Sequence, residues 1–258
     1  MFSLYDERMG LNEETPRYTP TLFSSYPEFK GQVFYPGNLE KNRELFASEN
    51  LKKSIEEGAK QMGFSRLIKL QLSHSTTVYH LKNFDFDPTQ TFPADSIIVD
   101  IPQVAIALTH ADCQATLIYD LRKKRFAAVH AGWRGLFGNI YIKTIEKMCS
   151  LGSKSTDLLA FLGPSLGLKH AAFENYRNEI PKVYHRKKVF PHHFDLKAIA
   201  KEQFLSQGLL ESNIEISPLC TAENNDFCSY RRAKKQNGST SARNFTICGL
   251  DFLSSPVT

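Results

Sequence analysis

A pair of short apolar runs near the middle of the chain constrains the fold most. The runs Ala115–Asp120 and Arg125–His130 are rich in apolar and β-branched residues, and the basic turn DLRKKR joins them. Apolar runs of this length that meet at a polar turn are typical of two buried, paired β-strands. The segment therefore predicts a β-hairpin in the interior of the protein.

Other periodic segments predict further strands and helices around this hairpin. Strands are expected near Gln32–Tyr35 and at residues 67–72, 76–81, 96–100, 104–109, 158–162, 214–216, 229–231 and 244–249. Helices are expected at residues 39–63, 136–149, 173–184 and 196–207, the last with Asp195 as its N-cap and Gly208 after its end. A loop is expected between residues 82 and 95.

The order of these segments predicts the fold class. Neither an internal repeat nor a linker interrupts the 258 residues, so we expect a single α/β domain over residues 1–258. Its central mixed sheet would be flanked by helices. Residues 1–35 contain Pro16, Pro20 and Pro27, and are expected to form a mostly irregular N-terminal arm.

Composition excludes several classes of protein. The chain is 41% hydrophobic with a formal charge of +5, and its basic cluster at residues 185–188 lacks interleaved aromatic residues, so we expect no nucleic-acid partner. No apolar run approaches the roughly 18–20 residues needed to cross a membrane, and the polar start does not resemble a signal peptide. Five cysteines, an odd number without a C-x-x-C pair, favour reduced thiols in the cytoplasm.

A candidate metal site emerges at the open end of the predicted hairpin. Cys113 precedes one strand and His130 ends the other, so strand pairing brings them side by side. His74, at a polar break between two apolar runs, is the best third member. Two imidazoles and a thiolate with one open position form a catalytic zinc pattern, although copper accepts the same donors. Taken singly, a buried cysteine and a core histidine are the commoner explanations.

Neighbouring residues have two interpretations each. Asp112 is either a turn acceptor or a group for acid–base chemistry or ligand support. Arg134, in a glycine-flanked turn before a helix, is either a solvated side chain or part of an anion site. Trp133 either stacks on a planar base or belongs to the core, and Arg231 and Arg232 are similarly ambiguous. The other histidines considered are interpreted as surface or core residues: His80, His170, His185, His192 and His193.

Five motifs together resemble a known family. They are HAGWRG at residues 130–135, ADC at 111–113, GPSLG at 163–167, CTAENNDFCSYRR at 220–232, and the terminal Arg243. On these motifs the chain is similar to the YfiH-type family, described both as laccase-like polyphenol oxidases and as zinc-dependent purine nucleoside phosphorylases. The resemblance runs from about residue 42 to residue 250, and HAGWRG is its most specific string.

The resemblance implies a metal site and a substrate class. It implies that His74, Cys113 and His130 bind the metal, zinc or else copper, within one α/β domain with a central sheet. It also implies purine nucleoside and phosphate as substrates, with phosphorolysis of adenosine, inosine, guanosine and methylthioadenosine and deamination of adenosine. We assign Asp112 and Arg134 as catalytic candidates, with Arg134 placed at the phosphate by its position.

Some segments depart from the family pattern. LSHS stands where the family has Gln-Val-His-Gly, and HADC where it has Thr-Ala-Asp-Cys, which places His110 beside the site. The N-terminal Ser-Leu-Asn segment is shortened, and LKHAAFE replaces Cys-Cys-Tyr-Glu. Three alternatives therefore stand beside a phosphorylase: a copper-dependent polyphenol oxidase, a non-catalytic partner-binding protein, and an editor of cell-wall precursors. The oxidase is disfavoured because the chain contains no His-x-His pair.

Overall fold

The computed structural model describes residues 11–12, 14–84, 91–238 and 241–252. The first ten residues of the expected N-terminal arm and positions 85–90 of the expected loop lie outside this part. Within it, none of the helices has both the length and the apolar character required to span a membrane.

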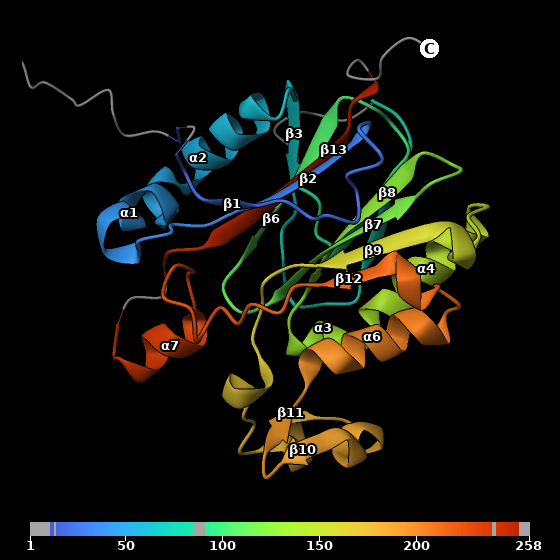
Figure 1. Cartoon of the computed structure of the whole chain (residues 1–258). Helices are drawn as coiled ribbons and strands as arrows, with labels where there is room; N and C mark the ends of the chain where they lie inside the picture. Colours follow the sequence, from blue (N-terminus) through green and yellow to red (C-terminus); the bar gives the residue numbers. More distant parts are fainter. Residues whose placement is uncertain (1–10, 13, 85–90, 239–240, 253–258) are drawn as a thin grey trace, which may run out of the picture.

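Two mixed β-sheets lie face to face at the centre of the molecule (Figure 1). The first has the order β1 (Arg17–Tyr18), β2 (Phe29–Phe34), β13 (Asn244–Leu250), β6 (Val104–His110) and β3 (Arg66–Lys69). The second has the order β12 (Ile214–Ile216), β9 (Leu158–Leu162), β7 (Gln114–Asp120), β8 (Arg125–Ala131), β5 (Ser96–Val99) and β4 (Val78–Leu81). The α/β class is thus confirmed, and the expected central sheet is divided in two.

The predicted hairpin is β7 and β8, which pair antiparallel from Gln114 opposite Ala131 to Asp120 opposite Arg125. The Asp120 carboxylate closes the turn by accepting the backbone N–H groups of Arg122 and Lys123. Both strands are buried along their whole length because the two faces of this sheet meet different layers. Alternate side chains therefore enter different cores, which explains why the runs are apolar throughout.

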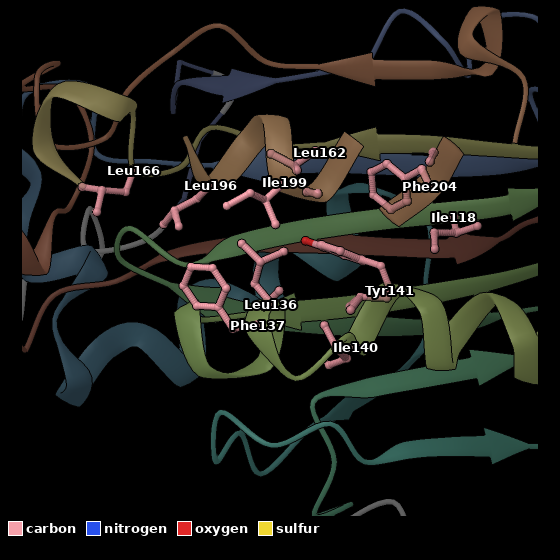
Figure 2. Packing of buried hydrophobic residues seen from close by; sticks show 14 of the residues in the cluster. Ile118, Leu136, Phe137, Ile140, Tyr141, Leu162, Leu166, Leu196, Ile199 and Phe204 are labelled. Carbon is pink, nitrogen blue, oxygen red and sulfur yellow. The ribbon is translucent and has the colours of Figure 1, made fainter. Parts of the chain in front are cut away.

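Each sheet is covered on its outer face by helices. The helices α3 (Trp133–Phe137), α4 (Ile140–Ser150) and α6 (Leu196–Ser206) cover the sheet that contains the hairpin. Figure 2 shows Leu136, Ile199 and Phe204 of these helices packed around Tyr141 against this sheet. On the other side, α1 (Leu39–Phe46) and α2 (Ser48–Gln61) cover the sheet that contains β13. The order of layers is helix, sheet, sheet, helix.

Two predicted helices are each divided by a local backbone break. The segment 39–63 forms α1 and α2 because Ala47 between them has an extended ψ of 154°. The segment 136–149 is divided because Asn139, with φ of 65°, turns the chain between α3 and α4. Asp195 caps α6 as expected, accepting the backbone N–H of Ala198.

Two other expectations are corrected. The helix expected at 173–184 is reduced to α5 (Tyr176–Glu179) and a 3-10 turn, η3 (Lys182–Lys187), because Pro181 between them cannot donate a helical hydrogen bond. The strand expected at 229–231 is instead the start of helix α7 (Tyr230–Lys235). The Ser229 hydroxyl accepts the backbone N–H of Arg232 there, which favours a helix N-terminus.

The strand expected near Gln32–Tyr35 is present as β2. Residues 188–194 form a small hairpin of β10 (Lys188–Phe190) and β11 (His193–Phe194).

The chain passes from one sheet to the other between β6 and β7. Only residues 111–113 join these two strands, so they cross the end of the core in a sharp turn. Asp112 makes this turn with φ of 86°, in the left-handed region, and its carbonyl accepts the backbone N–H of Leu166. The crossing places Cys113 at the open end of the hairpin, beside the last residues of β8.

Candidate metal centre

The structure brings His74, Cys113 and His130 together from three separate parts of the chain. One ligand atom of each lies within 4.8 Å of the others. The Cys113 Sγ is 3.7 Å from His74 Nε2, and the two imidazole rings are 5.1 Å apart between centroids. His130 is buried at the end of β8, Cys113 is half-buried, and His74 is exposed, so the cluster opens toward solvent on one side.

A buried carboxylate, Asp95, organises two of the three ligands. Its Oδ1 accepts the Nδ1–H of His130 at 2.9 Å and the backbone N–H of His74 at 3.0 Å. Its Oδ2 accepts the hydroxyl and backbone N–H groups of Ser73 and Ser75. Burial alone would raise the pKa of Asp95, but the hydrogen bonds from His130 and Ser75 hold the pKa well below its usual range.

Asp95 fixes the tautomer of His130 that a metal requires. Because Nδ1 donates to the carboxylate, Nε2 is the ring nitrogen directed at the cluster. Sequence reasoning did not identify Asp95 as a site residue. The one sequence feature that could have indicated it is the position of this acidic residue, directly before the apolar run that forms the buried strand β5.

The thiol and the imidazole also affect each other's protonation. Burial would raise the pKa of Cys113, but hydrogen bonds and charge from His130 and His74 lower it to about 7. Burial would lower the pKa of His130, but Asp95 and the Cys113 thiolate raise it to about 9. The cluster therefore favours the thiolate form of Cys113 near neutral pH, which is the form that binds metals and reacts as a nucleophile.

Gly132 leaves the space that the cluster occupies. A Cβ atom at this position would lie 2.3 Å from His74 Cδ2 and 3.3 Å from Cys113 Sγ. Its backbone φ of −70° is ordinary for any residue, so the requirement for glycine is the close approach and not the conformation. His74 itself has φ of 59°, held by the hydrogen bond from its backbone to Asp95.

The cluster lies in the wall of a cavity of about 570 Å³. Predicted residues that line it are Asp112, Trp133, Arg134 and Arg231, and Phe173, Tyr230 and Arg243 complete an aromatic and cationic rim. The Arg134 guanidinium lies 4.1 Å from the Trp133 ring, and the Trp133 ring packs edge-on against Phe173. A cavity of this size with convergent polar groups fits a small-molecule ligand.

Asp112 lies beside the cluster but its carboxylate is already engaged. Its Oδ1 accepts the Thr221 hydroxyl at 2.7 Å, and its Oδ2 accepts the backbone N–H of Arg231 at 2.6 Å. The second hydrogen bond ties the start of α7 to the crossing between the sheets. The contacts of Asp112 are therefore those of a residue that holds the cavity wall.

The structure separates the two adjacent arginines that the sequence left ambiguous. Arg231 donates to the Ala172 carbonyl and lines the cavity. The Arg232 guanidinium instead donates to the carbonyls of Thr221, Ala222, Asn224 and Phe227. Arg232 is thus a structural residue that closes the loop before α7, and Arg231 is the one of the two that lines the cavity.

His110, next to the cluster in sequence, is not among its ligands. Its Nε2 lies 3.0 Å from the Thr246 hydroxyl on the neighbouring strand β13, and the ring is buried. Burial and the charge of His130 lower the pKa of His110 to about 3, so the ring is neutral. Of the histidines interpreted as surface or core, His80 pairs with Asp100, whereas His170 belongs to a second group of potential ligands.

Known proteins resemble this chain in sequence and in fold. A Synechocystis protein named purine nucleoside phosphorylase is 34% identical over 167 residues, which cover 54% of this chain and 63% of that protein. A Bacteroides thetaiotaomicron protein of the same name is 31% identical over 155 residues, covering 56% of this chain and 57% of that protein. The chain thus spans less than two thirds of the length of these two relatives.

The fold is shared with the crystal structure of the hypothetical protein YfiH from Bacillus licheniformis. The TM-score is 0.73 at 19% identity, with coverage of 88% of this chain and 94% of that chain. The fold expected from the YfiH-type resemblance is thereby confirmed. A family model described as multi-copper polyphenol oxidoreductase laccase matches residues 41–244. The chain therefore belongs to this family.

Proposed function

We propose that the protein is a metal-dependent purine nucleoside phosphorylase. The observation that carries this proposal is the His74–Cys113–His130 cluster in the wall of a cavity with an aromatic and cationic rim. The names of the two curated relatives supply the reaction class, and the cavity supplies a place for both substrates.

The donor set of the cluster fits zinc. Two imidazoles and a thiolate leave one coordination position for water or substrate, as in catalytic zinc sites. The hydrogen bond from His130 to Asp95 is the outer support that such ligands require, and Gly132 keeps the ligand side chains unobstructed. A bound zinc ion would supply Lewis-acid stabilisation of negative charge on an oxygen or nitrogen. Copper fits the same donors and is the alternative metal.

The remaining residues would bind and orient the substrates. In phosphorolysis a phosphate oxygen forms a bond to ribose C1′ while the C1′–N9 bond breaks, and the bond electrons leave with the purine, which takes up a proton. Arg134 would hold phosphate at the rim, with Arg231 as a second cation. Trp133, Phe173 and Tyr230 offer ring faces and edges for the purine. Asp112 would act by positioning Arg231 and the cluster turn.

The substrate range that we propose is adenosine, inosine, guanosine and methylthioadenosine. The same cavity would also deaminate adenosine, a reaction in which water replaces the 6-amino group and ammonia leaves. We infer from the five cysteines that the protein works in the reducing cytoplasm.

The test is product formation by the purified full chain after loading with zinc. Free purine base should appear from inosine only when phosphate is present, together with an equal amount of ribose 1-phosphate. Cys113→Ser and His130→Asn should abolish turnover, whereas His193→Ala, a change on β11, should not. If the fully zinc-loaded protein released no purine base from adenosine, inosine, guanosine or methylthioadenosine, the proposal would be contradicted. That result would favour a partner-binding or cell-wall-precursor function.

A polyphenol oxidase is the second candidate, because the matched family model carries that description. It requires oxygen consumption with a phenol by the copper-loaded protein, and loss of that consumption in His130→Asn. Phenol oxidation faster than phosphorolysis would reverse the order of the two proposals.

A further inference from the structure

A second group of potential metal ligands lies away from the first cluster. His170, Cys220 and Glu223 each offer one ligand atom within 4.8 Å of the others. They come from two segments: η2 (Leu168–His170), which follows the GPSLG turn, and the start of the CTAEN turn. None of the three belongs to the site described above, and the sequence alone suggested no role for His170.

The backbone holds these two segments together. Ser165 and Cys220 form a parallel β-bridge, in which the backbone N–H of Thr221 donates to the Ser165 carbonyl at 3.2 Å. Gly167 lies so close that a Cβ there would be 3.1 Å from Cys220 Sγ. The relative position of the ligands is therefore set by the fold and does not require a metal to assemble it.

The sulfur of Cys220 is held by a hydrogen bond from the backbone. Its Sγ accepts the backbone N–H of Gly167 at 3.2 Å, which is the type of outer hydrogen bond that supports metal-bound sulfur. The ammonium group of Lys197, which donates to the carbonyls of Ser217 and Leu219, interacts electrostatically with Cys220. The Cys220 sulfur therefore has a backbone donor and a cation in its surroundings, as a sulfur ligand of a metal ion requires.

The other two ligands are accessible. The His170 ring is half-buried, and within the described residues it makes no hydrogen bond to another side chain. Glu223 is exposed, and Lys169 is its ion-pair partner at 3.4 Å. Because both members of this pair are exposed, little free energy is needed to separate them. The imidazole and the carboxylate are thus free to bind an ion together with the buried sulfur.

We propose that His170, Cys220 and Glu223 form a second binding site for a divalent transition metal of the zinc class. Sulfur, imidazole and carboxylate are the donors that zinc accepts, and three protein ligands leave the ion exchangeable. A metal here would join two segments of the chain. One contains His170 and Leu166, and Leu166 lines the cavity. The other contains Cys220 and Thr221, and the Thr221 hydroxyl donates to Asp112. The site would stabilise the cavity wall and take no part in the chemistry.

The test is the zinc stoichiometry of the full chain, measured by equilibrium dialysis and elemental analysis. We expect two equivalents for the unchanged protein and one for His170→Ala or Glu223→Gln. Lys169→Ala should keep both equivalents and bind the second more tightly, because it removes the competitor of Glu223. His192→Ala is the matched histidine control and should also keep two equivalents.

Cobalt distinguishes this site from the first cluster. In Cys113→Ser protein the first cluster has no sulfur, so a thiolate-to-cobalt charge-transfer band must arise elsewhere. We expect this band in Cys113→Ser and its loss in Cys113→Ser/His170→Ala, with both proteins folded by circular dichroism. Absence of the band in Cys113→Ser, or its survival without His170, would overturn the second site. Neither result depends on phosphorylase activity, so failure of the proposed function leaves this test intact.

Discussion

The Nδ1–H of His130 donates to the Oδ1 of Asp95 at 2.9 Å, and the backbone of His74 donates to the same oxygen. One buried carboxylate therefore positions two candidate ligands that are 56 residues apart in sequence. This relationship makes Asp95 a positioning residue whose effect on metal binding can be measured separately from any turnover.

Replacing Asp95 with Asn should weaken zinc binding by roughly 10–100-fold. The neutral amide lacks the negative charge that strengthens the His130 imidazole as a ligand, and it no longer fixes the proton on Nδ1. The zinc affinity is measured by competition with a chelator of known affinity. Asp157→Asn, a change in a 3-10 turn that has no buried residue, is the control and should leave the affinity unchanged. An unchanged zinc affinity in Asp95→Asn would show that the carboxylate does not position the ligands.

Asp95 should also contribute to acid unfolding. Its pKa in the folded protein lies well below the ordinary value of 3.8. A depressed carboxyl pKa stabilises the fold above the unfolded pKa, and this contribution is lost as the pH falls through the folded value. The free energy of unfolding, from urea titrations of the metal-free protein, should therefore decrease below about pH 4. The decrease should be shallower in Asp95→Asn, and equal slopes for the two proteins would contradict the assignment.

Gly132→Ala should abolish metal binding at the His74–Cys113–His130 cluster while leaving the protein folded. The added Cβ would lie 2.3 Å from His74 Cδ2, so the exposed His74 side chain must move out of the cluster. Because φ is −70°, the alanine backbone itself is unstrained. Gly238→Ala is the matched control, since its nearest neighbour would be 3.5 Å away. Zinc stoichiometry and thermal unfolding are compared for the two variants, and full zinc binding by Gly132→Ala would refute the steric argument.

Cys113 should be the most reactive thiol of the metal-free protein near neutral pH. Its pKa is lowered to about 7, whereas burial raises the pKa of Cys228 to about 12. Alkylation by iodoacetamide, followed by peptide mass spectrometry, should show half-maximal reactivity of Cys113 near pH 7. His130→Asn should move this midpoint upward, and added zinc should protect the thiol. Labelling of Cys228 before Cys113 would contradict the prediction.

Replacing Arg134 or Arg232 with alanine should change different properties of the protein: phosphate binding in the first case and stability in the second. Arg134→Ala removes a cation from the cavity rim and should raise the KM for phosphate roughly 10–100-fold, with a smaller change for the nucleoside. Arg232→Ala removes the donor to four carbonyls and should lower the free energy of unfolding by about 1–3 kcal/mol. Steady-state kinetics and urea unfolding of both variants check this contrast. A phosphate KM that is unchanged in Arg134→Ala would remove Arg134 from the proposed phosphate site.

Some features of the fold and site follow from local sequence because their causes are local. The hairpin of β7 and β8 is predicted by two apolar runs around a basic turn, and its pairing places Cys113 beside His130. The N-cap of α6 at Asp195 is likewise a matter of neighbouring residues. The helix breaks at Ala47 and Asn139 were not predicted, because the helical spacing of apolar residues continues across both positions.

Tertiary structure decided everything that depends on distant segments. The assignment of β6 and β7 to different sheets follows from which apolar faces meet, and no local pattern records that choice. The same packing brings Asp95 under His74 and His130, and it brings His170 to Cys220. The sequence by itself determined the candidate ligands and the hairpin that pairs two of them. Only the packing of the two sheets, driven by burial of both their faces, determined the carboxylate and the cavity that surround them.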